Sequence, residues 1–156
     1  MKRLIRICVG IVLIAIICII WNILNSNNTI FFINWNIKIP KAYKVDVIYS
    51  YEFRDGEDLE IWHYDKRKIE KMINSGNFTM VDEKNQSFII KKLDEYHQSL
   101  DQNEKNLFES NVDINSLVIK ENYFLFLNKN EKHNLTWTLL ILDFKNKQIY
   151  YFNNVC

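Results

Sequence analysis

The stretch "YKVDVIYSYEFRDGEDLEIWHY", residues 43–64, decides the fold class of this chain. In its first half, apolar or aromatic residues alternate with polar ones, which is typical of a strand with one face against a core. The positions expected on that single apolar face are Tyr43, Val45, Val47, Tyr49, Tyr51 and Phe53. Alternation returns over residues 59–64, and Asp55-Gly56 between the two runs is a two-residue hairpin signal. The stretch therefore predicts a β-hairpin.

Two helical patterns follow this hairpin. Asp65 is a suitable N-cap for the first helix, and Gly76 supplies a left-handed stop. The second helix is predicted over residues 87–100. The residues expected to face the core from the two helices are Ile69, Met72, Ile73, Phe88, Ile89, Leu93, Tyr96 and Leu100. The polar segment 101–116 predicts either a broken helix or a loop.

The C-terminal third predicts a meander of three strands, over residues 117–127, 135–144 and 148–153. Residues 128–134 form the first expected turn, and residues 145–147 form the second. The runs "YFLFL" and "LLIL" are apolar on both faces, as expected of central strands that are covered on both sides. The order β-β-α-α-β-β-β predicts an α+β domain, with one five-stranded antiparallel sheet and helices packed on one face.

The N-terminal run over residues 4–24 is apolar except for Arg6, Gly10 and Asn22. A helix of this length spans ~30 Å at ~1.5 Å per residue, which matches the hydrocarbon core of a bilayer. A buried helix of a soluble domain usually has a polar stripe, and this run has none. We therefore expect a single-pass transmembrane anchor with Trp21 at its interfacial end.

The membrane topology follows from the flanking residues. Lys2 and Arg3 lie in a short N-terminal tail, residues 1–3, which the positive-inside rule places in the cytoplasm. The alternative is a cleaved signal peptide, but the apolar run is longer than usual and no small-x-small pair follows it. We therefore expect an uncleaved anchor in the cell membrane, a juxtamembrane linker over residues 25–41, and the domain, residues 42–156, outside the membrane.

The linker contains aromatic residues and the only proline of the chain. Phe31, Phe32 and Trp35 can form an interfacial collar, or they can belong to a first strand or a linker packed on the domain. Pro40 biases the residue before it towards an extended conformation, which is typical of a domain boundary.

Charge and cysteine content exclude several kinds of partner. The chain carries 20 basic and 19 acidic residues, so no basic surface for nucleic acid is expected. Cys8 and Cys18 lie in the apolar run, which leaves Cys156 as the only cysteine of the domain. An intradomain disulfide and a thiolate metal site are therefore excluded. Cys156 can form an intermolecular disulfide in an oxidising compartment, or it can stay a free thiol.

Two segments carry a resemblance to a class of known proteins. They are "FRDGED", residues 53–58, and "LDFKNKQIYYF", residues 142–152. Both resemble segments of small uncharacterised membrane-anchored proteins of low-GC Gram-positive bacteria, although this chain lacks the His-Gly expected before Asp55. The resemblance covers about a fifth of the chain. It implies an anchored domain and brings no catalytic residue with it.

The acidic turn is the first candidate surface. Arg54 and Glu57 flank Asp55-Gly56 and can face each other as a cross-strand ion pair. The turn can be a simple solvated loop, a calcium site or the tip that binds a partner. Strand alternation points Glu57 away from Asp58, and no calcium-loop spacing is present, so we expect no metal and no cofactor.

The second candidate surface is aromatic. Trp62 and Tyr64 share the polar face of Glu60 and are expected to be exposed, where they would anchor a protein or glycan partner. The candidate binding residues of the chain are Arg54, Asp55, Glu57, Trp62 and Tyr64.

The leading functional hypothesis is a membrane-anchored extracytoplasmic domain that binds another protein or an envelope component and is not an enzyme. No phosphate-binding loop, dinucleotide fingerprint or nucleophile elbow is present. One alternative is a small hydrolase-like enzyme in which His63, His97 or His133 acts beside a carboxylate or Cys156. Another alternative is an immunity or inhibitor protein that blocks a toxin.

Overall fold

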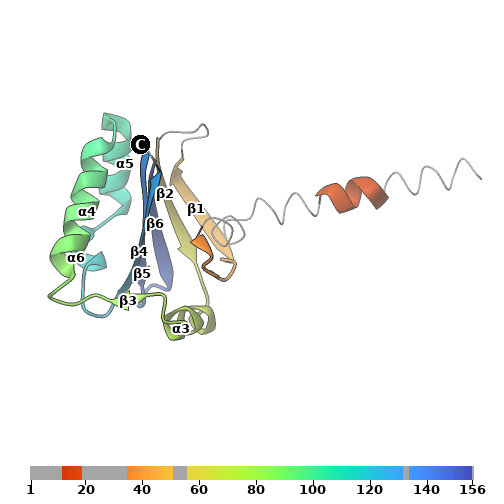
Figure 1. Cartoon of the computed structure of the whole chain (residues 1–156), viewed down its shortest axis with the longest axis horizontal. Helices are drawn as coiled ribbons and strands as arrows, with labels where there is room; N and C mark the ends of the chain where they lie inside the picture. Colours follow the sequence, from red (N-terminus) through yellow and green to blue (C-terminus); the bar gives the residue numbers. More distant parts are fainter. Residues whose placement is uncertain (1–11, 19–34, 51–55, 132–133, 156) are drawn as a thin grey trace, which may run out of the picture. The chain divides into compact units, whose positions relative to one another are not determined.

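The computed structural model describes residues 12–18, 35–50, 56–131 and 134–155. The chain divides into two compact units, Met1–Lys41 and Ala42–Cys156. In the first unit, residues 12–18 form a helix (Figure 1). They are the only described part of the predicted anchor, residues 4–24, and none of the described helices has the length and apolar character needed to cross a membrane.

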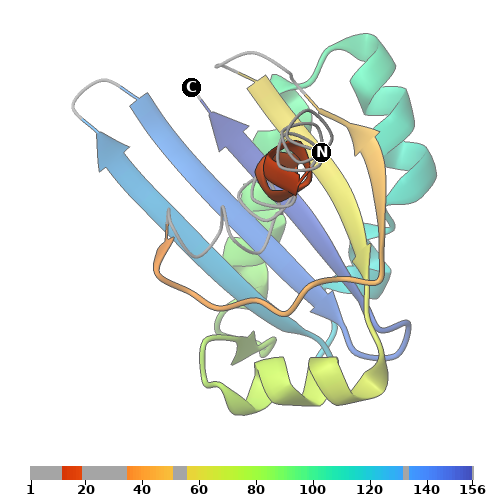
Figure 2. The same ribbon diagram turned by 90° about the vertical axis from the view of Figure 1, so that its right-hand side faces the viewer.

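The second unit is an α+β domain with a six-stranded antiparallel sheet, in the order β1-β2-β6-β5-β4-β3 (Figure 2). The strands are β1 Lys44–Tyr49, β2 Gly56–His63, β3 Thr79–Met80, β4 Tyr123–Glu131, β5 Asn134–Asp143 and β6 Gln148–Val155. The α+β class and the antiparallel sheet are confirmed, but the prediction of five strands is wrong. The additional strand, β3, pairs with Tyr123 and Phe124 of β4, and two residues are too few to show a period in sequence.

Figure 1 shows α4, α5 and α6 along one side of the sheet, with α3 across one end. The helices are α3 Lys66–Asn74, α4 Gln86–Ser99, α5 Gln102–Asn111 and α6 Ile114–Leu117. The first two confirm the helices predicted after the hairpin, and Asp65 caps α3 by accepting a hydrogen bond from the Lys68 amide. The segment left open as a broken helix or a loop contains α5 and α6. Asp101 and Glu104 start α5 by a reciprocal capping box, with hydrogen bonds of 2.9 Å in each direction.

The main core lies between the sheet and these helices. Fully buried residues of the strands, such as Leu59 and Phe152, face Ile89, Leu93 and Tyr96 of α4. Burying a side chain of this size contributes about 1.5–3 kcal/mol to folding. Phe88, which was predicted to face inward, is instead partly exposed and meets the Phe126 ring edge-on.

A β-bulge in β1 corrects the prediction of one continuous apolar face. The register shifts between Val47 and Tyr49, because Val47 pairs with Glu60 whereas Tyr49 pairs with Leu59. The extra residue moves Tyr49 to the face that carries the helices, where its ring stacks on Tyr96, and leaves Val47 on the opposite face. Tyr51 and Phe53 lie outside the described residues.

The predicted strand ends also need adjustment. The meander begins at Tyr123 and not at Leu117, because Leu117 belongs to α6. β4 runs to Glu131 and β5 starts at Asn134, so the first turn of the meander is much shorter than the predicted seven residues. The last strand of the meander, β6, pairs with β2 along the full length of β2.

Candidate functional site

The aromatic surface predicted around Trp62 and Tyr64 is wrong, because only 2% of each residue is exposed. Trp62 pairs with Ile149 of β6, and its ring stacks on Tyr151 with 4.9 Å between the ring centres. Its Nε1 donates a hydrogen bond to Glu60. In the sequence, Glu60 suggested that this face of β2 is polar and exposed. In the structure, Ile149 and Tyr151 of the neighbouring strand β6 make the same face apolar.

Only part of the acidic turn lies among the described residues. Arg54, Asp55 and Cys156 lie outside them. Glu57 stands at the start of β2 and its Oε1 accepts a hydrogen bond of 3.3 Å from Asn154 Nδ2 in β6. Within the described part of the chain, no group of three or more His, Cys, Asp or Glu residues is arranged to hold a metal ion.

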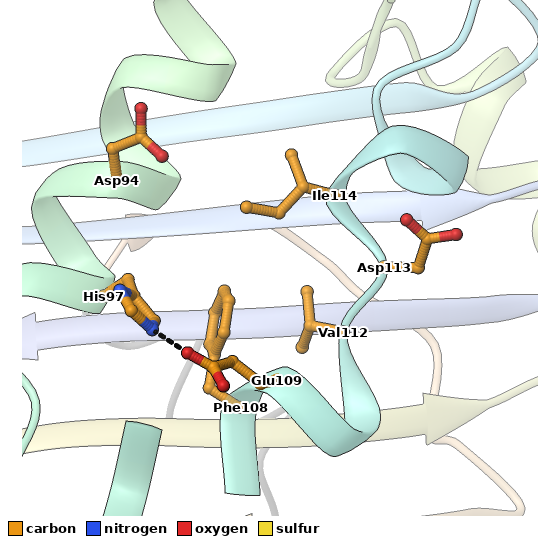
Figure 3. Close-up of a pocket in the computed structure, with 7 residues that line it drawn as sticks. All are labelled: Asp94, His97, Phe108, Glu109, Val112, Asp113 and Ile114. Atoms are coloured by element: carbon orange, nitrogen blue, oxygen red, sulfur yellow. Dashed lines mark hydrogen bonds and ion pairs between the residues drawn. The ribbon is translucent and has the colours of Figure 1, made fainter. Parts of the chain in front are cut away.

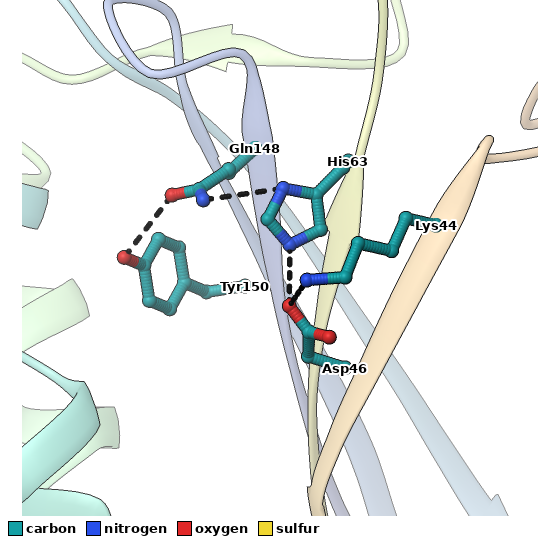
Figure 4. A network of polar contacts seen from close by, with 5 residues as sticks. All are labelled: Lys44, Asp46, His63, Gln148 and Tyr150. Carbon is teal, nitrogen blue, oxygen red and sulfur yellow. Dashed lines mark hydrogen bonds and ion pairs between the residues drawn. The ribbon is translucent and has the colours of Figure 1, made fainter.

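A polar network joins β1, β2 and β6 (Figure 4). His63 Nε2 lies 2.7 Å from Asp46 Oδ2, and Gln148 Nε2 lies 3.3 Å from His63 Nδ1. Asp46 Oδ2 also accepts a hydrogen bond of 2.8 Å from Lys44 Nζ. The hydrogen bond from Lys44, followed by the one with His63, lowers the pKa of Asp46. Both ring nitrogens of His63 have a polar neighbour, so the network fastens β1, β2 and β6 together.

A pocket of about 330 Å³ lies between α4, α5 and α6 (Figure 3). We call it the acidic pocket; the residues that line it are Asp94, His97, Phe108, Glu109, Val112, Asp113 and Ile114. Phe108 and Val112 are buried and form an apolar floor with Ile114. The three carboxylate residues are exposed and stand around that floor.

The local sequence explains how these side chains come together. Asp94 and His97 are three residues apart on α4, so both project from one face of the helix. Glu109 projects from the last turn of α5, and its Oε1 lies 3.1 Å from His97 Nε2, within hydrogen-bonding distance. Asp113 connects α5 to α6 and caps α6 by accepting a hydrogen bond of 3.1 Å from the Asn115 amide.

Electrostatics in the acidic pocket favour a positive charge. Among the described residues that line it, no lysine or arginine offsets the carboxylates. The C-terminal end of α5 lies at the pocket, and the dipole of this helix adds negative potential there. In the neighbouring sheet, burial raises the pKa of the Tyr150 hydroxyl, and the carboxylates of Asp143, which does not line the pocket, and of Asp113 raise it further.

Sequence reasoning did not find this pocket. Asp94 and His97 are three residues apart and can be recognised in the sequence as a helical pair, but two residues are too few for a zinc site. Glu109 and Asp113 lie in the segment that predicted either a broken helix or a loop. Their approach to α4 depends on how α5 folds back, and no local pattern encodes that.

Comparisons of the chain with protein-family models, with curated proteins and with solved structures found no match. The function of the domain is therefore inferred from the geometry of the acidic pocket.

Proposed function

We propose that the chain is a membrane-anchored interaction protein whose domain, residues 42–156, binds a protein or envelope partner outside the membrane. The apolar run over residues 4–24 and the basic residues before it support the anchor and its orientation. The observation that carries the binding role is the acidic pocket, in which three carboxylates surround an apolar floor. The ligand that fits this combination is a lysine or arginine side chain of the partner.

Such a side chain has an apolar stem and a charged end. The stem would lie on Phe108 and Ile114, while the ammonium or guanidinium group would reach the carboxylates of Asp94, Glu109 and Asp113. Each exposed ion pair contributes only ~0.2–1 kcal/mol, so a single side chain would bind weakly. A partner that presents several basic residues would bind more tightly, and the binding would weaken as salt screens the charges.

The test uses the full-length chain in detergent micelles and an acetylated penta-lysine peptide as the probe. Saturable binding at low salt is expected by calorimetry, with no binding of a penta-glutamate peptide. The variant Asp94→Asn/Glu109→Gln/Asp113→Asn should lose the binding, and Asn at position 113 keeps the α6 cap. The matched control neutralises three exposed carboxylates elsewhere, by Glu70→Gln, Glu83→Gln and Glu121→Gln. Equal losses in the two triple variants would mean that only net charge matters and that the pocket is not the site.

A small hydrolase-like enzyme is the second candidate, because His97 and Glu109 form a close pair in a pocket. The described residues that line the pocket include no Ser, Thr or Cys to act as a nucleophile, which favours the binding role. His97→Gln separates the two proposals. Loss of turnover on chromogenic esters with unchanged peptide binding would support the enzyme. An immunity or inhibitor protein is a narrower form of the binding proposal, in which the partner is a basic toxin.

A further inference from the structure

The segment "YKVDV", residues 43–47, is self-complementary when it is read in opposite directions. Apolar residues occupy positions 43, 45 and 47, a positive charge occupies position 44 and a negative charge occupies position 46. Reversing the direction exchanges the two charges and leaves the apolar positions in place. An antiparallel pair of two such segments therefore matches each charge with its opposite.

The fold places this segment at the edge of the sheet. β1 is the terminal strand in the order β1-β2-β6-β5-β4-β3, and it is seen in orange at one side of Figure 2. Within the described residues, β2 is the only strand that pairs with β1. A terminal strand has backbone N–H and C=O groups along its outer edge that can pair with another chain.

The side chains of this edge are unusually apolar for a surface. Tyr43 is 68% exposed, Val45 is 38% exposed and Val47 is 57% exposed. Val45 and Val47 share one face, since they pair with Trp62 and Glu60 of β2. On the other face, the Lys44 and Asp46 side chains are also accessible.

Edge strands are commonly protected from pairing by a lysine or by a bulge, and β1 has both. The bulge lies between Val47 and Tyr49, so the regular pairing with β2 extends over residues 44–47 and the register shifts only after the self-complementary segment. Lys44 does not block pairing with an identical strand, because the opposing position carries Asp46. Lys44 and the bulge therefore disfavour pairing with most strands but still allow pairing with an identical strand.

We propose that β1 pairs in antiparallel fashion with β1 of a second copy of this chain, about a two-fold axis through Val45. In this register, Lys44 lies opposite Asp46 of the second copy, Val45 lies opposite its own equivalent, and Tyr43 lies opposite Val47. Both copies use the same surface, as a two-fold interface requires. Side chains directly opposite in such a pair have Cβ atoms about 4.5–5.5 Å apart, which allows the ion pairs and the apolar contacts to form. The two sheets join into one continuous sheet.

Disulfide trapping tests this register in the full-length chain in detergent micelles, with Cys8, Cys18 and Cys156 replaced by serine. Val45→Cys should form a disulfide-linked dimer under mild oxidation, because the two cysteines face each other at the axis. Val47→Cys should not, because its two copies would lie about 13 Å apart along the strands. Ile119→Cys is the matched control, since Ile119 is also 38% exposed and lies away from β1. Similar cross-linking of all three variants would overturn the proposal.

A charge exchange provides the second test, read as the fraction of dimer by light scattering. Lys44→Asp and Asp46→Lys should each weaken the association by roughly tenfold, because each places like charges opposite each other. The double variant Lys44→Asp/Asp46→Lys should restore it. Asp46→Lys and the double variant both lack the Asp46 contact with His63, so a change in folding cannot account for the restoration. A double variant that associates no better than Asp46→Lys would contradict the proposed register.

Discussion

The hydroxyl group of Tyr96 donates a hydrogen bond of 2.6 Å to the backbone carbonyl of Asp58, and so fastens helix α4 to strand β2. Tyr96 is fully buried, and its ring contacts the rings of Phe108, Trp137 and Phe152. The residue therefore links the helix that carries Asp94 and His97 both to the sheet and to α5, the helix that carries Glu109.

Tyr96→Phe removes this hydrogen bond and keeps the ring. The half-buried carbonyl of Asp58 loses a donor, so the free energy of unfolding should fall by about 1–2 kcal/mol, measured by chemical denaturation. Tyr150→Phe is the control, because its hydroxyl makes a longer hydrogen bond of 3.4 Å to Gln148 and should cost less. A Tyr96→Phe variant as stable as the original chain would show that the bond does not hold α4 in place.

Leu93→Ala should destabilise the domain by about 2–5 kcal/mol, because Leu93 is completely buried between α4 and the sheet and its truncation leaves a cavity. Ile90→Ala, on the same helix, should cost far less, since Ile90 is exposed. Thermal and denaturant unfolding of both variants measures the difference. Equal losses at the two positions would mean that α4 does not present this face to the core.

Asp101→Ala should lower the free energy of unfolding by about 1 kcal/mol, because Asp101 accepts a hydrogen bond from the Glu104 amide at the start of α5. Asp101→Asn keeps an acceptor at this position and should recover most of the loss. The comparison is made by denaturant unfolding at neutral pH. If Asp101→Ala and Asp101→Asn had the same free energy of unfolding, the hydrogen bond accepted by residue 101 would not contribute to stability.

The stability of the domain should depend on Asp46 in acid. Its pKa is held below the ordinary value of 3.8, first by the hydrogen bond from Lys44 and then by the one with His63. A carboxyl with a lowered pKa in the folded state stabilises the fold above its unfolded pKa. This stabilisation is lost as pH falls through the folded pKa. Asp46→Asn should therefore be less stable than the original chain at neutral pH, and the two should converge below about pH 4. Denaturant midpoints of both proteins, measured at several pH values in the acid range, test this expectation. A difference in stability that stays constant with pH would show that the ionisation of Asp46 does not stabilise the fold.

Local patterns in the sequence predicted those elements whose signals are short-range. The caps at Asp65 and Gly76 bound α3 because a side-chain acceptor and a positive φ are local requirements, and Gly76 does adopt a φ of 75°. The alternation over Leu59 and Ile61 predicted β2 in the same way.

The features that the sequence did not predict depend on contacts between distant segments. Trp62 looked exposed because it follows Glu60, yet Ile149 and Tyr151 of β6 decide which side of β2 is apolar. The bulge beside Val47 shifts the register by one residue, and alternation alone cannot show such a shift. Glu109 and His97 approach each other only because α5 folds back beside α4.

The most direct test of the proposed function is the response of the Ile114 side-chain methyl to penta-lysine, followed by NMR on the full-length chain. We predict a saturable change in the methyl chemical shift at low salt, because Ile114 lines the acidic pocket. The change should disappear in Asp94→Asn/Glu109→Gln/Asp113→Asn and persist in the control variant with three neutralised carboxylates elsewhere. An Ile114 signal that does not move while the peptide binds would contradict the proposal and place the interaction on another surface.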